Sequence, residues 1–161
     1  MRMMNEVGKK VVFIVNKSPN PMPSYAHAGD SGMDLRAWIT DEEGGEITLK
    51  PLERKLIHTG VYVELPEYTE AQIRTRSGCA LKQGLVVLNS PGTCDNFYRN
   101  EIGIIAINLS NEDIVIRNGD RIAQMVICPV FLKELVEIKE KDEVSTNTER
   151  GTDGFGSTGL K

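Results

Sequence analysis

One acidic and one aromatic residue stand in a segment of the sequence where their chemistry could be used. Asp95 and Tyr98 lie in NSPGTCDNFYRNE, residues 89–101, which is longer and more polar than a plain hairpin between two apolar runs requires. Asp95 could take a proton from water as a general base, and Tyr98 could pack against a sugar or a base. The simpler alternative makes Asp95 a turn residue and Tyr98 part of the rim of the core.

RTRSG, residues 74–78, has the residue types of a phosphate-binding segment. It runs into a predicted short helix, whose first N–H groups carry partial positive charge. Arg76 could bind phosphate with its guanidinium fork, Ser77 with its hydroxyl and Gly78 through close approach of its backbone. A capped helix with solvated arginines is the alternative.

Two further polar residues lie in otherwise apolar strand segments. Asp34, in GMDLRA, is either an acid behind a functional site or a strand-end turn partner. Gln124, in RIAQM, is predicted to point inward, and a buried amide must find hydrogen-bond partners. Gln124 is therefore either a structural crosslink or a ligand contact.

The segment RGTDGFGSTG, residues 150–159, combines glycines with an arginine and a phenylalanine. A Gly-, Ser- and Thr-rich terminus is usually a flexible end. Arg150, however, offers a fork that matches phosphate, and Phe155 reduces solubility unless it packs. Since Ser157 and Thr158 add hydrogen-bond donors, the pattern is typical of a lid that closes over phosphates.

Other kinds of chemistry find little support. His27 and His58 have no Ser or Cys nucleophile elbow nearby, which argues against a catalytic triad. Cys79, Cys94 and Cys128 form no CxxC pair and are interpreted as reduced thiols. The net charge is −4 and the basic residues are scattered, so no nucleic acid polymer is expected as a partner.

The elements that must position these residues are predicted to be short strands. The apolar runs are brief, rich in β-branched residues and bounded by Gly, Pro, Asn or Asp, a pattern that favours an all-β barrel or jelly-roll-like sandwich. The predicted strand segments are residues 11–15, 56–65, 85–88, 102–109, 113–117, 121–131 and 134–139.

Local signals add a turn and a helix to this prediction. Asn-Gly in RNGDR, residues 117–121, predicts a tight hairpin between two strands. SGCALKQG predicts one short helix, with Ser77 as its N-cap and Gly84 at its end.

The length of 161 residues fits one domain, with a β core over residues 1–139 and a polar C-terminal arm over residues 140–161. No apolar run approaches the roughly 20 residues of a membrane span. Because the first residues also lack an apolar signal region, a cytoplasmic protein is expected.

In their order along the chain, these segments resemble the five motifs of the trimeric deoxyuridine triphosphate nucleotidohydrolases, the dUTPases. The five segments are AGDSGMDLRA (28–37), RSGCALK (76–82), NSPGTCDNFYRNEI (89–102), GDRIAQMVI (119–127) and RGTDGFGSTG (150–159). The resemblance implies a distorted jelly roll, a homotrimer with active sites shared between subunits, and Mg²⁺-dependent hydrolysis of dUTP to dUMP and diphosphate. That reaction would limit uracil incorporation into DNA and supply dUMP for dTMP synthesis.

The resemblance also implies a role for each matching residue. Asp95 matches the aspartate that activates the attacking water, and Gln124 a glutamine near the α-phosphate. Tyr98 matches the tyrosine packed on deoxyribose. Asp34 matches an acid that contacts Mg²⁺ through water, while the triphosphate supplies the direct metal ligands.

The remaining matching residues would bind the substrate. Uracil would be held by Asn89, Gly92 and Thr93, with Gly103 at a position that touches the substrate in the family. The phosphates would be bound by Arg76, Ser77 and Gly78, and by Arg150 of the lid. Phe155 would stack over uracil, while the lid would wrap the phosphates through Gly156, Ser157 and Thr158.

Three alternatives remain open. A dCTP deaminase resembles this fold and shares parts of the second and fourth motifs, but it would need a glutamate placed to act on cytosine. A non-catalytic nucleotide-sensing protein of the same fold would not need Asp95 as a base. A generic β-sandwich interaction protein would leave the C-terminal segment unexplained.

Overall fold

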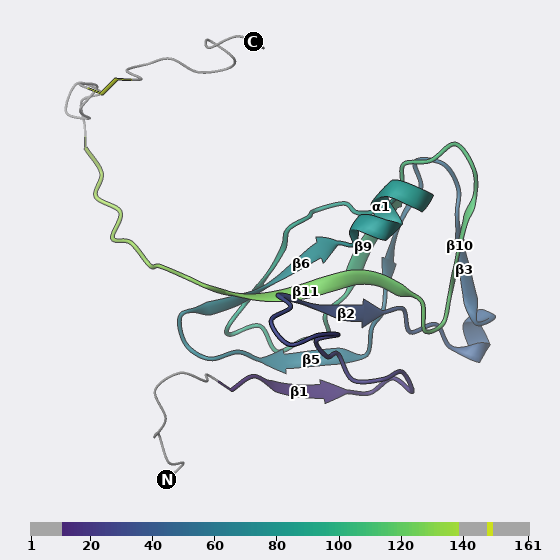
Figure 1. Ribbon diagram of the computed structural model, residues 1–161, viewed down its shortest axis with the longest axis horizontal. Coiled ribbons are helices and arrows are strands. Elements are labelled where there is room, and N and C mark those ends of the chain that lie inside the picture. The colour runs from purple at the N-terminus through teal and green to yellow at the C-terminus, as the bar shows by residue number, and fades with distance from the viewer. Residues whose placement is uncertain (1–10, 139–147, 150–161) are drawn as a thin grey trace. The chain divides into compact units, whose positions relative to one another are not determined.

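The computed structural model describes residues 11–138 and 148–149. The chain divides into two units, Met1–Phe131 and Leu132–Lys161. Within the described residues, all helices and strands belong to the first unit (Figure 1). No helix in this part of the chain is long and apolar enough to cross a membrane.

The strands of the described residues pair antiparallel in four sheets. Two sheets have two strands each: β1 (Phe13–Asn16) with β5 (Val61–Glu64), and β3 (Glu46–Leu49) with β10 (Ile114–Arg117). A four-stranded sheet has the order β2 (Gly32–Arg36), β11 (Arg121–Pro129), β6 (Thr69–Thr75), β8 (Gly92–Asp95). A three-stranded sheet has the order β4 (Arg54–Ile57), β9 (Ile104–Asn108), β7 (Leu85–Val87).

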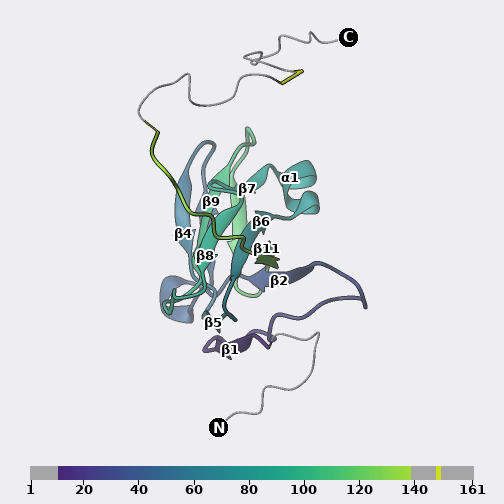
Figure 2. The same ribbon diagram turned by 90° about the vertical axis from the view of Figure 1, so that its left-hand side faces the viewer.

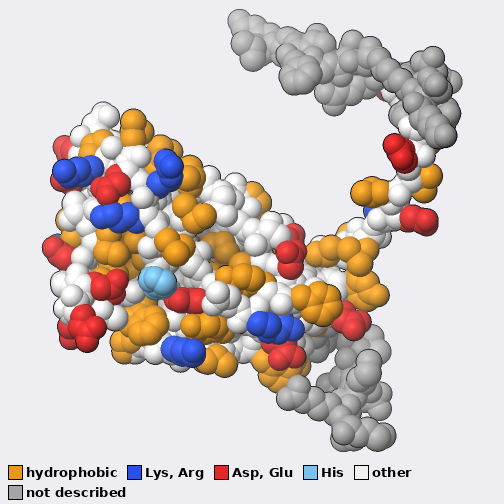
Figure 3. Space-filling model, turned by 180° about the vertical axis from the view of Figure 1, so that it is seen from behind, with side chains coloured by type: hydrophobic (Ala, Val, Ile, Leu, Met, Phe, Trp, Pro, Cys, Tyr) orange, Lys and Arg blue, Asp and Glu red, His pale blue; other side chains and the backbone are white. Residues whose placement is uncertain are grey.

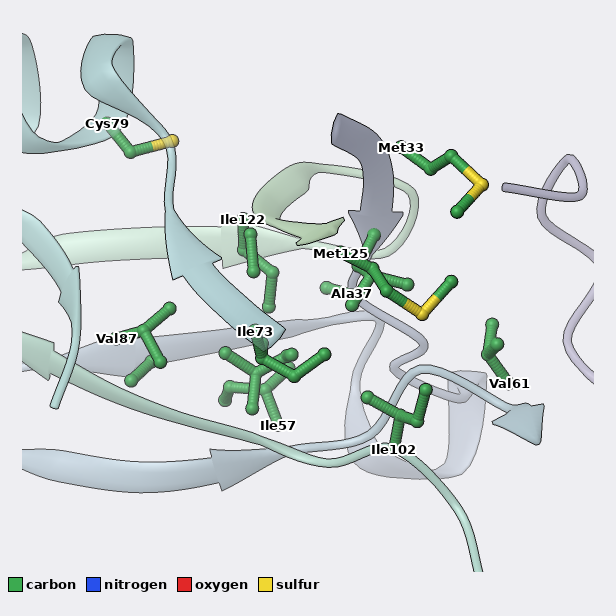
Figure 4. Close-up of a cluster of buried hydrophobic side chains, with 14 of the residues drawn as sticks. Met33, Ala37, Ile57, Val61, Ile73, Cys79, Val87, Ile102, Ile122 and Met125 are labelled. Carbon is green, nitrogen blue, oxygen red and sulfur yellow. The ribbon is translucent and has the colours of Figure 1, made fainter. Parts of the chain in front are cut away.

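The two larger sheets form opposite layers of the first unit. Figure 2 shows β4 and β9 on one side and β2 and β11 on the other. Between them lies an apolar core that includes Ile57, Ile73, Ile102 and Met125, all nearly or fully buried (Figure 4). The predicted all-β, jelly-roll-like architecture is therefore confirmed, although the sheets do not close into a continuous barrel.

The predicted helix is present as α1 (Ser77–Gln83), and it ends at Gly84 with φ of 70°. A positive φ favours glycine because a side chain would clash in that conformation. The prediction that Ser77 is the N-cap is wrong. Arg76, which continues the extended backbone of β6, occupies the N-cap position, so Ser77 is the first helical residue and its hydroxyl caps nothing.

The turn predicted at RNGDR exists, but the hairpin does not. Asp120 N–H donates to Arg117 C=O at 3.0 Å, and Gly119 has φ of 87°. The flanking strands β10 and β11 nevertheless belong to different sheets. The turn is fixed from outside instead, since Gly119 N–H donates to Ala37 C=O at 2.8 Å.

The strand predicted at residues 134–139 is also absent over the described residues 132–138. These residues are exposed, including Leu135 and Val136. A strand requires a neighbour to pair its backbone groups, and none of the described strands pairs with this segment. The apolar pattern alone therefore does not produce a strand here.

Candidate active site

A hollow of about 440 Å³, here called the arginine pocket, lies where β2, β11 and the start of α1 meet. It is open to solvent and polar, and two arginines and two aspartates contribute to its wall. The lining residues are Ser24, Ala26, His27, Asp30, Ser31, Gly32, Asp34, Arg76, Ser77, Gly78, Arg121 and Gln124.

Ion pairs centred on Asp34 organise one wall of the arginine pocket. Asp34 Oδ1 accepts a hydrogen bond from Arg76 Nε at 2.7 Å, and Asp34 Oδ2 accepts one from Arg121 Nη1 at 3.1 Å. The Asp34 and Arg76 side chains are about a quarter exposed and that of Arg121 is half exposed. The three charges therefore remain accessible from the pocket.

A β-bulge in β11 places two polar residues in this pocket. The pairing of β11 with β2 shifts register between Arg121 and Ala123, and both Ile122 and Ala123 are buried. In a regular strand, residues three apart face opposite sides. Because of the extra residue, Arg121 and Gln124 can both line the arginine pocket, and Gln124 Nε2 donates to Thr75 C=O at 3.1 Å.

A second hollow of about 190 Å³, here called the hairpin pocket, lies beside β8. Its wall combines buried apolar side chains with backbone from the segment that follows β7. The lining residues are Ile73, Val87, Asn89, Gly92, Thr93, Cys94, Tyr98, Glu101, Ile102 and Gly103. Tyr98 is fixed at this pocket, since its hydroxyl donates to Glu101 C=O at 3.0 Å.

Glu101 ties the hairpin pocket to the turn between β4 and β5. Its Oε1 accepts hydrogen bonds from the Thr59 N–H at 2.9 Å and the Gly60 N–H at 2.7 Å, and its Oε2 lies 2.9 Å from His58 Nδ1. Burial raises the pKa of Glu101, but hydrogen bonds from Gly60, His58 and Thr59 outweigh burial and lower that pKa below its usual value. The carboxylate is thus held in its charged form.

Asp95 ends β8 and is exposed, and it lines neither of the two pockets. Its directly opposite neighbour on β6 is Glu70, so both carboxylates lie on the same face of the sheet. Burial, followed by the charges of Asp95 and Glu70, raises the pKa of the adjacent Cys94 thiol. Asp95 is therefore available to a ligand that reaches across the sheet edge.

Comparison with known proteins gives a consistent result. A family model described as dUTPase matches residues 18–159. The chain belongs to the dUTPase family. It is 52% identical to a deoxyuridine 5'-triphosphate nucleotidohydrolase of Cytophaga hutchinsonii, with 92% of this chain and 91% of that protein covered. It is 55% identical to one of Clostridium novyi, with coverage of 86% and 91%.

Solved dUTPase structures are also similar to this chain. A dUTPase mutant of Staphylococcus bacteriophage 80alpha, solved with dUpNHpp, has a TM-score of 0.77 and 29% identity, covering 94% of this chain and all of that one. A dUTPase mutant of Staphylococcus aureus phage phi11, in which a structural Mg(II) ion is coordinated, has a TM-score of 0.71 and 25% identity, with coverage of 81% and 98%.

Most of the residues predicted from the dUTPase motifs fall into two groups in the structure. The arginine pocket contains five of the six described residues predicted to lie near the phosphates or the metal: Asp34, Arg76, Ser77, Gly78 and Gln124. The sixth, Asp95, lines neither pocket. The hairpin pocket contains all five predicted to bind the nucleoside: Asn89, Gly92, Thr93, Tyr98 and Gly103. Arg150, Phe155, Gly156, Ser157 and Thr158 lie outside the described residues.

Arg121 and Glu101 were not predicted as site residues, although both lie inside quoted motifs. Regular alternation along β11 would put Arg121 and Gln124 on opposite faces of the sheet. The sequence pattern therefore predicts that Arg121 lies outside a site that contains Gln124. Glu101 accepts hydrogen bonds from the backbone N–H groups of Thr59 and Gly60, which are distant from it in the sequence. No local sequence pattern indicates such a contact.

The described residues suit Mg²⁺ only when the substrate supplies part of its ligands. Within them, no three His, Cys, Asp or Glu side chains form a group that could hold a metal ion. Asp34 offers carboxylate oxygens in the arginine pocket, but both already accept hydrogen bonds from arginines. Mg²⁺ is commonly held by one or two carboxylates, waters and substrate phosphates, and that mode fits this pocket.

Proposed function

We propose that this chain hydrolyses dUTP to dUMP and diphosphate. The observation that carries the proposal is the grouping of the motif residues, since nucleoside-side residues share the hairpin pocket and phosphate-side residues share the arginine pocket. The curated relatives named above carry this activity in their names. The reaction would limit uracil incorporation into DNA and provide dUMP.

The hairpin pocket is suited to a small pyrimidine nucleoside. Its volume of about 190 Å³ is bounded by buried Ile73, Val87 and Ile102, and its polar groups include the Asn89 amide and the backbone of Gly92 and Thr93. Such a wall can pair with the edge of uracil and leave no room for the methyl group of thymine. Steric exclusion of this kind discriminates between substrates strongly.

Tyr98 is proposed to set the preference for deoxyribose. Its hydroxyl is held by the Glu101 carbonyl, so the ring has a fixed position at the pocket wall. A ring packed on the sugar would clash with a ribose 2′-hydroxyl. Selectivity against ribonucleotides then comes from shape and requires no charged group.

The arginine pocket is proposed to bind the triphosphate together with Mg²⁺. Two arginines and two aspartates line it, so with neutral His27 its side chains carry no net charge. A polyanion therefore needs an additional cation. Mg²⁺ bound to the phosphates supplies charge neutralisation, with Asp34 in contact through water, while Arg76, Ser77 and Gly78 orient the phosphates.

Asp95 is proposed as the general base that takes a proton from the water attacking the α-phosphorus. The exposed carboxylate has room for a water molecule and a phosphate beside it. Gln124, whose amide is anchored on Thr75, would orient the α-phosphate and this water. In-line displacement requires little more from a protein than positioning, charge stabilisation and one base.

We propose a homotrimer whose active sites are shared between subunits. Within one chain, the residues proposed to bind the nucleoside and those proposed to bind the phosphates line two separate pockets. The outer face of the β4–β9–β7 sheet supports this assembly, since five apolar side chains lie there at least partly exposed: Leu56, Val86, Leu88, Ile105 and Ile107. Figure 3 shows hydrophobic side chains gathered on this side of the molecule. Burying such a face against another copy would stabilise the assembly.

The outer face of the β4–β9–β7 sheet also borders the substrate site. A Cβ atom at Gly103 would approach Leu56 Cδ1 to 2.7 Å, so the Leu56 side chain lies against a residue that lines the hairpin pocket. A neighbouring subunit placed on this face would adjoin the nucleoside. Its arginine pocket could then receive the triphosphate.

Residues 140–161 are proposed as an arm that closes over bound substrate. Arg150 would reach the terminal phosphates, Phe155 would stack on uracil, and residues 156–158 would wrap the phosphates.

We also propose that the protein is cytoplasmic. Its three cysteines are free thiols, as is usual in a reducing compartment.

The proposal is tested by incubating the protein with dUTP and with dCTP in the presence of Mg²⁺. Release of dUMP and diphosphate from dUTP, with dCTP left intact, is the expected result. Ammonia from dCTP without diphosphate from dUTP would establish a deaminase instead. Binding of dUTP without turnover would establish a non-catalytic nucleotide-sensing protein.

A further inference from the structure

Asp34 connects two arginines that belong to different parts of the fold. Arg76 precedes α1 and Arg121 opens β11, while Asp34 itself lies in β2. Each carboxylate oxygen accepts one arginine N–H, at 2.7 Å and 3.1 Å. Asp34 thus forms ion pairs with two cationic side chains.

A further contact fixes the two arginines relative to one another. Arg76 Nη1 donates to the backbone carbonyl of Arg121 at 3.3 Å. The position of Arg121 depends in turn on the register shift between Arg121 and Ala123. The β2–β11 pairing thus sets the separation of the two guanidinium groups.

Both guanidinium groups keep donors for a ligand. Arg76 Nη2, Arg121 Nε and Arg121 Nη2 make no hydrogen bond to any described residue. Both arginines line the arginine pocket together with Ser77 and Gly78. Planar guanidinium groups bind phosphate oxygens well when their orientation is already fixed.

The negative charge of Asp34 opposes the binding of an anion, so its presence in this pocket calls for a geometric reason. We propose that Asp34 is a positioning residue that holds Arg76 and Arg121 as a pair of phosphate-binding groups, and that Arg121 is a further residue of the triphosphate site. The inference rests on the proposed function, because it takes the triphosphate of dUTP as the ligand. It assigns Asp34 a role that does not require Mg²⁺.

The test is calorimetric titration with inorganic triphosphate in EDTA, so that no metal contributes. Asp34→Asn removes the charge and keeps the side-chain shape. It is expected to weaken binding about fivefold to fiftyfold, because the ligand must then order two arginine side chains itself. A role limited to the metal predicts no loss under these conditions.

Asp30→Asn is the matched control. Asp30 lines the same pocket and accepts hydrogen bonds from His27, but it pairs with no arginine of the described residues. Removing its charge is expected to leave triphosphate affinity unchanged or to increase it. A loss of triphosphate affinity in Asp34→Asn that is absent in Asp30→Asn supports the proposal. Equal changes in affinity for the two substitutions would overturn it, because the loss of a carboxylate would then have the same effect with and without an arginine partner.

A double-mutant cycle isolates the contact with Arg121. Arg121→Gln is expected to weaken triphosphate binding by itself, and Asp34→Asn should cost less in that background than in the wild type. If Asp34→Asn fails to fold in a thermal unfolding scan, the effect of Arg121→Gln still decides the role of Arg121. Unchanged binding by Arg121→Gln, or wild-type protein that binds no triphosphate, would overturn the proposal.

Failure of the proposed function and failure of the inference about Asp34 and Arg121 give different experimental results. A wild-type protein that does not hydrolyse dUTP, but binds triphosphate and loses affinity on Asp34→Asn, would reject the proposed function and leave the arginine pair supported. A protein that hydrolyses dUTP, with metal-free triphosphate binding that does not depend on Asp34, would reject only the inference.

Discussion

Replacing Glu101 by Ala is expected to destabilise the fold by removing an acceptor from two buried N–H groups. Thr59 and Gly60 are buried, and both donate to Glu101 Oε1, at 2.9 Å and 2.7 Å. A buried donor left without a partner costs about 1 to 3 kcal/mol. Since water can enter the space left by the side chain, we expect a total loss of about 2 to 4 kcal/mol.

Urea unfolding at fixed protein concentration measures this loss. Glu101→Gln keeps an acceptor for the two N–H groups and should cost much less than Glu101→Ala. Glu53→Ala is a second control, because Glu53 accepts one backbone N–H, from Lys50 at 2.8 Å, at an exposed position. The reasoning would be refuted if Glu101→Ala lost no more stability than Glu53→Ala.

The contribution of Glu101 should also depend on pH. Its pKa in the folded protein is lowered from the ordinary value of 4.5. A lowered carboxyl pKa stabilises the fold above the unfolded pKa, and this stabilisation is lost as the pH falls toward the folded pKa. The stability difference between wild type and Glu101→Ala should therefore shrink from pH 7 to pH 4, and a constant difference would contradict the assigned charge.

Two further predictions concern the site. In Gly32→Ala, the new Cβ would clash with Gln124 Oε1, so the Gln124 side chain must move. The kcat for dUTP should then fall by about tenfold or more, and an unchanged kcat would contradict the role of Gln124. Cys94 should react more slowly with a thiol reagent at pH 8 than Cys128, because its pKa is raised; faster labelling of Cys94 would contradict its burial beside Asp95.

Local sequence patterns predicted the elements that have a strong local signal. The β-branched run at residues 102–109 contains β9, and α1 ends at the expected glycine. The single strand predicted over residues 56–65 is interrupted at residues 58–60, between β4 and β5. Strands β3, β6 and β8 were not predicted as strands, since EITL and GTCD are short and TEAQIRT carries polar residues on its more exposed face. These strands exist because partners far along the chain pair with them.

Long-range pairing also explains the local predictions that failed. Asn-Gly produced a turn but no hairpin, because β3 and β2 compete successfully for β10 and β11. The motifs indicated the site residues one at a time, yet neither the division into two pockets nor the bulge that turns Arg121 toward Gln124 can be read from them.

Hydrolysis of dUTP in ¹⁸O-labelled water, by wild type and by Asp95→Asn, tests the central claim most directly. Attack of water on the α-phosphorus predicts that the label enters dUMP and is absent from the diphosphate. Asp95→Asn should bind dUTP and release almost no product, because the water has lost its base. Label in the diphosphate, or wild-type turnover by Asp95→Asn, would contradict the proposed mechanism.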